Sequence, residues 1–203
     1  MSVAHDVATT LVRGVDLIAT PWKNGGGITR EVAAYPHGAG LETFVWRVSV
    51  AEVAQAGPFS RFTAIDRTLV LLSGAGMRLD DAQGTTHALT EPLDIACFAG
   101  EAAIDAQLVD GATRDFNLMV RRGVATGGVE VWRDGAQHTV SADVALLFCA
   151  TGTVDVTLDD AAPVSLATDD TLRIERPQAL RCAVRGAGAL LAVMIRYTGS
   201  SQA

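Results

Sequence analysis

The sequence predicts an all-β fold built from two similar halves. Short apolar runs recur at intervals of about 8–12 residues, separated by Gly, Asp and Thr, which is typical of β-sandwiches and barrels. Apolar residues show hardly any helical periodicity along the chain. In addition, two segments of the first half recur in the same order in the second half. Together these observations favour a duplicated β architecture.

The individual strands follow from apolar runs or alternation over the lengths that strands usually have. SerGlyAlaGly at residues 73–76 and AlaThrGly at residues 150–152 are typical of the connections in β-hairpins. We expect strands at Thr43–Val50, Thr68–Leu72, Gly76–Leu79, Asp115–Val120, Val144–Cys149, Val154–Leu158 and Leu190–Tyr197.

The internal repeat relates two pairs of segments. RTLVLLSGAGMRL (67–79) resembles VALLFCATGTVDVTL (144–158), and HALTEPLDIACF (87–98) resembles VSLATDDTLRIER (164–176). One offset of about 77–79 residues relates both pairs, which predicts a duplicated β unit, although convergent strand patterning could produce the same likeness.

The repeat also suggests how the chain divides into domains. We place a first domain at residues 1–115 and a second at residues 116–203, joined near residues 116–135. The strands of the first half carry more polar residues than those of the second half. We therefore expect the functional site in the first domain.

Composition excludes several classes of function. The chain has 203 residues, 49% of them hydrophobic, a net charge of -7 and a pI of about 5.0. This balance supports a full apolar core and disfavours disorder. There is no basic run for a phosphate backbone, no apolar run as long as a membrane span, and no signal-peptide pattern at the start. We expect a cytoplasmic protein with neither nucleic acid nor membrane as a partner.

Cysteines and histidines give no sign of a metal or a catalytic thiol. Cys97, Cys149 and Cys182 lie in apolar stretches, and we expect all three to be buried reduced thiols. A metal site needs several such ligands to converge, whereas the four histidines are scattered: His5, His37, His87 and His138. We therefore expect no metal and no cofactor.

A glycine-rich segment, PWKNGGGITREV at residues 21–32, is the densest motif. Three consecutive glycines allow close backbone approach, and Asn24 before them favours a turn. Lys23 precedes the glycines instead of following them, so the segment does not match a nucleotide-binding loop. An ordinary turn and a ligand-contacting loop both remain open.

Strand alternation places polar residues together on one face of FVWRVSV, residues 44–50. Arg47 and Ser49 share a face, opposite Phe44 and Trp46. Arg47 is a natural carboxylate ligand, because a guanidinium can hold two oxygens at once.

The same alternation applies to RDFNLMVRR, residues 114–122. Asp115, Asn117 and Met119 share one face, opposite an apolar one. Asp and Asn are poor strand formers, so their presence calls for a reason. The polar faces point either to water or into a barrel. If they point inward, a bound carboxylate can satisfy several buried polar groups at once.

These blocks together resemble the HutD/Ves family. The similarity covers residues 21–122, with agreement in strand pattern continuing to Tyr197. It implies a bicupin fold, with two cupin-like barrels in one chain and without the usual cupin metal site. The family is associated with bacterial histidine-utilisation operons and has no established enzymatic activity. It is thought to bind a small pathway metabolite and to restrain the pathway's flux or expression.

The resemblance and the residue chemistry give one set of candidate ligand-binding positions. Arg47 would hold a carboxylate, amide and hydroxyl groups would add hydrogen bonds, and aromatic rings would form apolar walls. Thr63-Ala64 replaces the family's usual Pro-Gly pair, and Ala102-Ala103 stands where an aromatic residue is common. The candidates are Trp22, Lys23, Asn24, Arg47, Ser49, Phe62, Phe98, Gly100, Asp115, Asn117 and Met119.

Three functions remain open at this point. In the first, the protein binds an anionic intermediate of histidine breakdown, such as urocanate or an N-formyl or N-formimino glutamate. In the second, it is a metal-free enzyme acting on such a compound, with Lys23, Asp115 or Glu101 as acid or base. In the third, it is a structural partner protein. Exposed barrel edges also suggest a homodimer.

Overall fold

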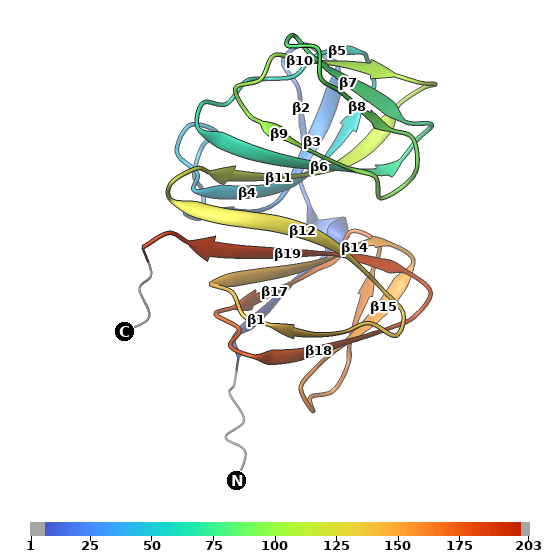
Figure 1. Ribbon diagram of the computed structural model, residues 1–203. Helices are drawn as coiled ribbons and strands as arrows, with labels where there is room; N and C mark the ends of the chain where they lie inside the picture. Colours follow the sequence, from blue (N-terminus) through green and yellow to red (C-terminus); the bar gives the residue numbers. More distant parts are fainter. Residues whose placement is uncertain (1–6, 200–203) are drawn as a thin grey trace. The chain divides into compact units, whose positions relative to one another are not determined.

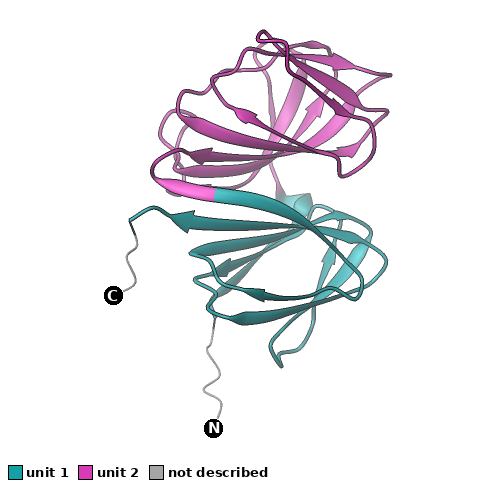
Figure 2. Cartoon of the chain, viewed as in Figure 1, with its two compact units in different colours: residues 1–16, 127–203 teal, residues 17–126 magenta. Residues whose placement is uncertain are grey.

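The computed structural model describes residues 7–199, and its regular secondary structure is almost entirely β-strand (Figure 1). Within that range the one helix is the 3-10 turn η1 (Gly14–Asp16), which confirms the all-β prediction. None of the described helices has the length and apolar character that crossing a membrane requires. The chain forms two compact units (Figure 2): residues 17–126, here the first barrel, and residues 1–16 with 127–203, here the second barrel.

The first barrel consists of two antiparallel sheets, in the orders β2-β3-β4-β11-β6-β9 and β5-β10-β7-β8. Apolar side chains from both sheets pack into one core between them. The strands are β2 (Ala19–Pro21), β3 (Gly27–Tyr35), β4 (Trp46–Val53), β5 (Gly57–Pro58), β6 (Ile65–Ser73), β7 (Met77–Asp81), β8 (Thr86–Leu89), β9 (Ile95–Ala99), β10 (Ile104–Leu108) and β11 (Thr113–Arg121).

The second barrel has the sheet orders β1-β17-β14-β19-β12 and β13-β18-β15-β16, again around a single apolar core. Its strands are β1 (Thr9–Val12), β12 (Ala125–Arg133), β13 (Gln137–Val140), β14 (Val144–Thr151), β15 (Thr153–Leu158), β16 (Val164–Ala167), β17 (Thr171–Glu175), β18 (Leu180–Arg185) and β19 (Ala189–Tyr197).

The two barrels share one strand order. The run β4-β11-β6-β9 of the first corresponds to β12-β19-β14-β17 of the second, and β5-β10-β7-β8 corresponds to β13-β18-β15-β16. The internal repeat in the sequence is therefore a repeat of topology as well.

The structure corrects the domain boundary expected between residues 115 and 116. That point lies inside β11, which is hydrogen-bonded to β4 on one side and to β6 on the other. Cutting there would divide an inner strand of the first barrel. The first barrel instead continues to residue 126, and the second recruits the N-terminal strand β1, which pairs with β17.

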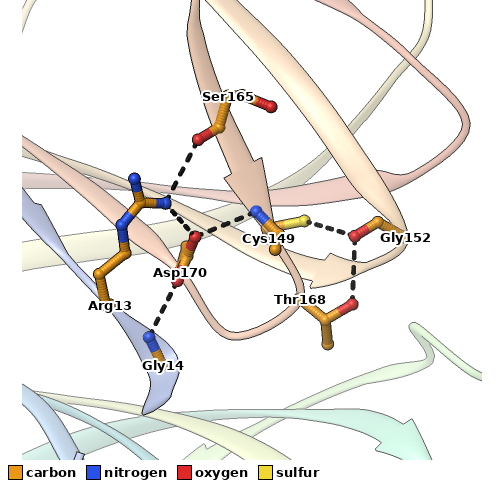
Figure 3. A network of polar contacts seen from close by, with 8 residues as sticks. Arg13, Gly14, Cys149, Gly152, Ser165, Thr168 and Asp170 are labelled. Atoms are coloured by element: carbon orange, nitrogen blue, oxygen red, sulfur yellow. Dashed lines mark hydrogen bonds and ion pairs between the residues drawn. The ribbon is translucent and has the colours of Figure 1, made fainter. Parts of the chain in front are cut away.

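A polar network anchors the end of β1 in the second barrel (Figure 3). Asp170 accepts hydrogen bonds from Arg13 Nη1 at 2.6 Å, Gly14 N at 2.9 Å and Ala167 N at 3.1 Å. Gly14 permits this contact, because a Cβ there would lie 2.4 Å from the Cβ of Asp169. The β1 residues are mostly exposed, so this network rather than apolar burial fixes the strand's end.

The cysteines fit the expectation at two of three positions. Cys149 and Cys182 are buried, and burial raises their thiol pKa values to about 11 and about 12, so both are poor nucleophiles at neutral pH. Cys97, by contrast, is exposed on β9, because it points away from the core on an edge strand.

We predict that Asp170→Ala lowers the free energy of unfolding by about 1–3 kcal/mol, because it leaves two backbone N–H donors and a guanidinium without their acceptor. Burial raises the pKa of Asp170, but its hydrogen bonds from Gly14 and Arg13 outweigh this and hold the pKa below the usual value. Urea unfolding measures the change. Asp160→Ala is the control, since its side chain is 91% exposed, and a loss as large as that of Asp170→Ala would contradict the assignment.

Candidate functional site

Polar side chains gather on the inner face of the six-stranded sheet of the first barrel. The register places Arg47 of β4, Met119 of β11 and Arg67 of β6 side by side, and Ser49 pairs with Asn117 in the next row. Cross-strand partners project to the same face, which here also carries the core leucines of β6. Of the two orientations that strand alternation left open, the structure selects the inward one.

Arg67 is the centre of this cluster. The residue is only 6% exposed. Its Nη2 donates to Asn117 Oδ1 at 2.9 Å, and its Nη1 makes a longer contact with the Ser60 carbonyl oxygen at 3.4 Å, while Nε is buried without a partner. Three aromatic rings surround the guanidinium, at 5.2, 5.8 and 5.0 Å from Cζ to the ring centroids: Phe59, Phe62 and Phe98.

The charge of Arg67 is only partly compensated. Burial lowers its pKa to about 10; the Asp115 carboxylate raises the pKa, and the Arg47 charge lowers it further. The guanidinium is therefore protonated at neutral pH, and its hydrogen-bonded partners, a side-chain amide and a carbonyl, are neutral. Ring faces attract a cation, but they supply no hydrogen-bond acceptor for Nε.

Asp115 is a second buried group with unmet hydrogen-bonding capacity. Neither carboxylate oxygen has a partner in hydrogen-bond geometry, and the buried Thr113 hydroxyl has none either. Burial raises the pKa of Asp115 to about 7, while the nearby Thr113 side chain and the Arg67 charge lower it by smaller amounts. Asp115 thus exchanges a proton close to neutral pH, which few carboxyl groups do.

Arg47 lies nearer to solvent and carries its own counter-ion. Its Nε donates to Glu31 Oε2 at 2.7 Å and its Nη1 donates to Ser49 Oγ at 3.2 Å. The Arg47 side chain is 13% exposed, whereas that of Glu31 is 43% exposed. Arg47, the residue expected to bind a ligand carboxylate, is therefore already paired with the carboxylate of Glu31.

Gly100 positions Phe62, one of the three rings around the Arg67 guanidinium. Its carbonyl oxygen accepts from Phe62 N at 2.7 Å, and its N–H donates to the Ile65 carbonyl oxygen at 2.6 Å. A Cβ at this position would lie 2.6 Å from the Phe62 carbonyl oxygen. Only glycine allows this approach, so Gly100 holds Phe62 against the barrel.

The glycine-rich segment forms the turn between β2 and β3. Trp22 packs against the core of the first barrel. Asn24 differs from the expectation, because its Oδ1 accepts from Gly26 N at 3.0 Å and so serves the turn itself. Lys23 is exposed in that turn. The contacts therefore favour the ordinary-turn interpretation for both polar residues.

Sequence reasoning missed Arg67 as a member of the site. It lies at the start of the segment DRTLVLL, whose residues 69–72 are apolar on both strand faces, so alternation alone did not show which way Arg67 points. One signal was available: Arg67 shares parity with Leu69 and Leu71, and both leucines belong to the core.

The second barrel provides an internal comparison for this cluster. Gly74 and Gly152 occupy equivalent hairpins after β6 and β14, and in each a Cβ would clash with backbone. Arg67 precedes Gly74 by as many residues as Ala145 precedes Gly152, and the pairing of β6 with β11 and of β14 with β19 then relates the remaining positions. Arg67, Asn117 and Asp115 correspond to Ala145, Ala192 and Leu190, respectively, which are buried and apolar. The fold therefore does not require polar residues there.

The histidines form no metal site in the described part of the chain, residues 7–199, where no three His, Cys, Asp or Glu side chains cluster. His37 is exposed, His87 lies beside the Phe98 ring at 6.2 Å, and His138 stacks on Trp132 at 3.8 Å. His5 lies outside the described residues.

We predict that Asp115→Asn makes the protein more stable than wild type at pH 8 and that the difference shrinks toward pH 4. The folded pKa of Asp115 is raised above its unfolded value, so its contribution to stability falls as pH rises from about 4 to 7. Over this pH range the contribution of Asp115 to the free energy of unfolding falls by an amount on the order of 4 kcal/mol. Urea unfolding of both proteins between pH 4 and 8 measures it; parallel stability curves would contradict the assignment.

Comparison with known proteins finds relatives that match from about half to about four fifths of this chain. A Pseudomonas putida protein, described as an uncharacterized 21.2 kDa protein in the hutC 3' region, is 38% identical over 167 residues, or 81% of this chain and 86% of the relative. Protein Ves of Escherichia fergusonii is 38% identical over 101 residues, covering 49% of this chain and 51% of Ves.

Solved structures show a similarity that covers nearly the whole chain. HutD from Pseudomonas fluorescens SBW25, determined in a formate condition, is 28% identical with a TM-score of 0.83 and covers 95% of this chain and 100% of that one. Lactobacillus farciminis oxalate decarboxylase, at 8% identity and a TM-score of 0.60, shares the fold alone. The family model named HutD matches residues 15–192. With this match and the P. putida relative, the chain belongs to the HutD family.

Proposed function

We propose that the first barrel binds a small anionic metabolite and that the protein acts as a regulator or accessory of histidine catabolism. The observation that carries this proposal is Arg67, a buried guanidinium with a free N–H that stands beside Asn117. In the second barrel, alanines occupy both equivalent positions. The association of the HutD family with the histidine-utilisation locus supports the choice of pathway.

The buried charge of Arg67 carries an energetic cost. Burying a cation without an ionic partner is unfavourable by several kcal/mol, and the neutral partners of Arg67 offset only part of it. A bound carboxylate would neutralise the charge and give Nε an acceptor. Such a charge-assisted contact, shielded from water by phenyl rings, contributes about 1.5–3 kcal/mol.

The remaining candidates take roles around this anchor. Arg47 and Ser49 supply a second polar group on the same face, and Met119 separates the two arginines. Phe62 and Phe98 are apolar walls. Urocanate and the N-formyl and N-formimino derivatives of glutamate carry the carboxylate that this arrangement would hold.

A metal-free enzyme remains the second candidate, and one observation favours it. Of the three acid–base candidates, Lys23 is exposed in a turn, and Glu101 is bonded to Arg122, which holds the Glu101 pKa below its usual value. Burial raises the pKa of Asp115 to about 7, which suits proton transfer at neutral pH. Slow conversion of urocanate or N-formyl-L-glutamate, followed by NMR and abolished in Asp115→Asn, would establish this alternative.

We predict that Arg67→Ala weakens the binding of N-formyl-L-glutamate or urocanate by roughly tenfold to a hundredfold, since it removes the charge-assisted contact. Arg67→Lys weakens it as well, because an ammonium lacks the planar fork with which a guanidinium holds a carboxylate and a second acceptor at once. Isothermal titration calorimetry on variants with unchanged circular dichroism measures the affinities.

Arg181→Ala is the matched control, because it removes an arginine that is exposed on the second barrel. Its affinity should equal that of the wild type. If Arg67→Ala binds both compounds as tightly as wild type, or if wild type binds neither, the proposed function is wrong.

A further inference from the structure

Two arginines lie at the same level of the first barrel. Arg47 pairs with Met119, and Met119 pairs with Arg67, so the arginines stand on strands separated by β11 alone. Adjacent antiparallel strands are about 4.8 Å apart, which places the two Cα atoms on the order of 10 Å from each other. Both side chains are long and project from the same face.

The two guanidinium groups differ in their counter-ions. Arg67 is hydrogen-bonded to neutral groups and has only the buried Asp115 carboxyl as a nearby anion. Arg47 is paired with Glu31, whose side chain is 43% exposed and able to move into solvent. Glu31 lies on β3 next to an irregularity in its pairing with β4.

We propose that Glu31 occupies a carboxylate subsite on Arg47 in the empty protein, and that the ligand is a dicarboxylate that binds Arg67 with one carboxylate and displaces Glu31 with the other. This inference rests on the proposed function and narrows its ligand from small anions in general to dicarboxylates. Glu31 then acts as an internal competitor.

The physical reason for a dicarboxylate is that two cations project from one face and one ligand carboxylate can pair with each. The Arg47 charge lowers the pKa of Arg67, so each guanidinium disfavours the other. A monocarboxylate bound to Arg67 leaves the Arg47–Glu31 pair intact. It therefore gains no binding free energy from a contact with Arg47. A second carboxylate on Arg47 replaces the Glu31 contact by an equivalent one and returns the exposed Glu31 side chain to water, where a carboxylate is well solvated.

The test uses two probes of the same size, glutarate and glutaramate, which differ in one carboxylate exchanged for an amide. Calorimetry at low ionic strength measures both on wild type, Arg47→Gln and Glu31→Gln. Glu52→Gln is the control, because it removes the same charge from β4, where Glu52 pairs with Arg30 and alternation places it on the opposite face from Arg47.

Wild type should bind glutarate roughly tenfold or more tightly than glutaramate, and Arg47→Gln should abolish that preference. Glu31→Gln should raise the affinity for glutarate several-fold more than Glu52→Gln does. Equal affinities for the two probes, or a glutarate affinity that falls in Glu31→Gln, would overturn this inference. If glutarate and glutaramate bind equally while N-formyl-L-glutamate or urocanate binds through Arg67, the proposed function stands and only the dicarboxylate inference is wrong. If no compound binds, the proposed function and the dicarboxylate inference are both wrong.

Discussion

The burial of a positive charge inside an apolar barrel is the constraint on which the candidate site depends. Arg67 points into a core of leucine and methionine side chains, where a cation is costly. Its surroundings reduce that cost in three ways. Phenyl rings turn toward the guanidinium, an amide oxygen accepts one hydrogen bond, and a nearby carboxyl adds partial negative charge. One N–H, on Nε, remains without an acceptor, and this is the feature from which we propose an anionic ligand.

The duplication shows how a small protein can tolerate such a site. The second barrel has the same strand order and an apolar side chain at each position where the first has Arg67, Asn117 or Asp115. Its core therefore has no buried charge to compensate at these positions, whereas the first barrel carries an arginine and a partnerless carboxyl. Stability that is lost at a binding site is a common cost of function. The difference between the two barrels isolates the stability cost of the polar cluster in the first barrel.

Much of this organisation could be predicted from the sequence. Alternation placed Arg47 with Ser49 and Asn117 with Met119, and both pairs face inward. The repeat indicated the shared topology. Arg67 was missed because residues 69–72 of its strand are apolar on both faces, which removes the alternation that would assign a face to it. Pairing partners such as Glu31 could not be found, because the contact depends on how β3 registers with β4 through an irregularity.

The overall charge of the protein decides how an anion can be recognised. At a net charge of -7, the chain as a whole does not attract anions, and at physiological ionic strength exposed charges act only over about 8 Å. Affinity must therefore come from short-range contacts with Arg67 and Arg47, whose shielding from solvent strengthens each contact. A site of this kind lacks long-range steering, so its affinity depends on the geometry of the ligand's carboxylates more than on its total charge. Under the proposed function, such dependence on ligand geometry would let the protein distinguish one anion from others of the same charge.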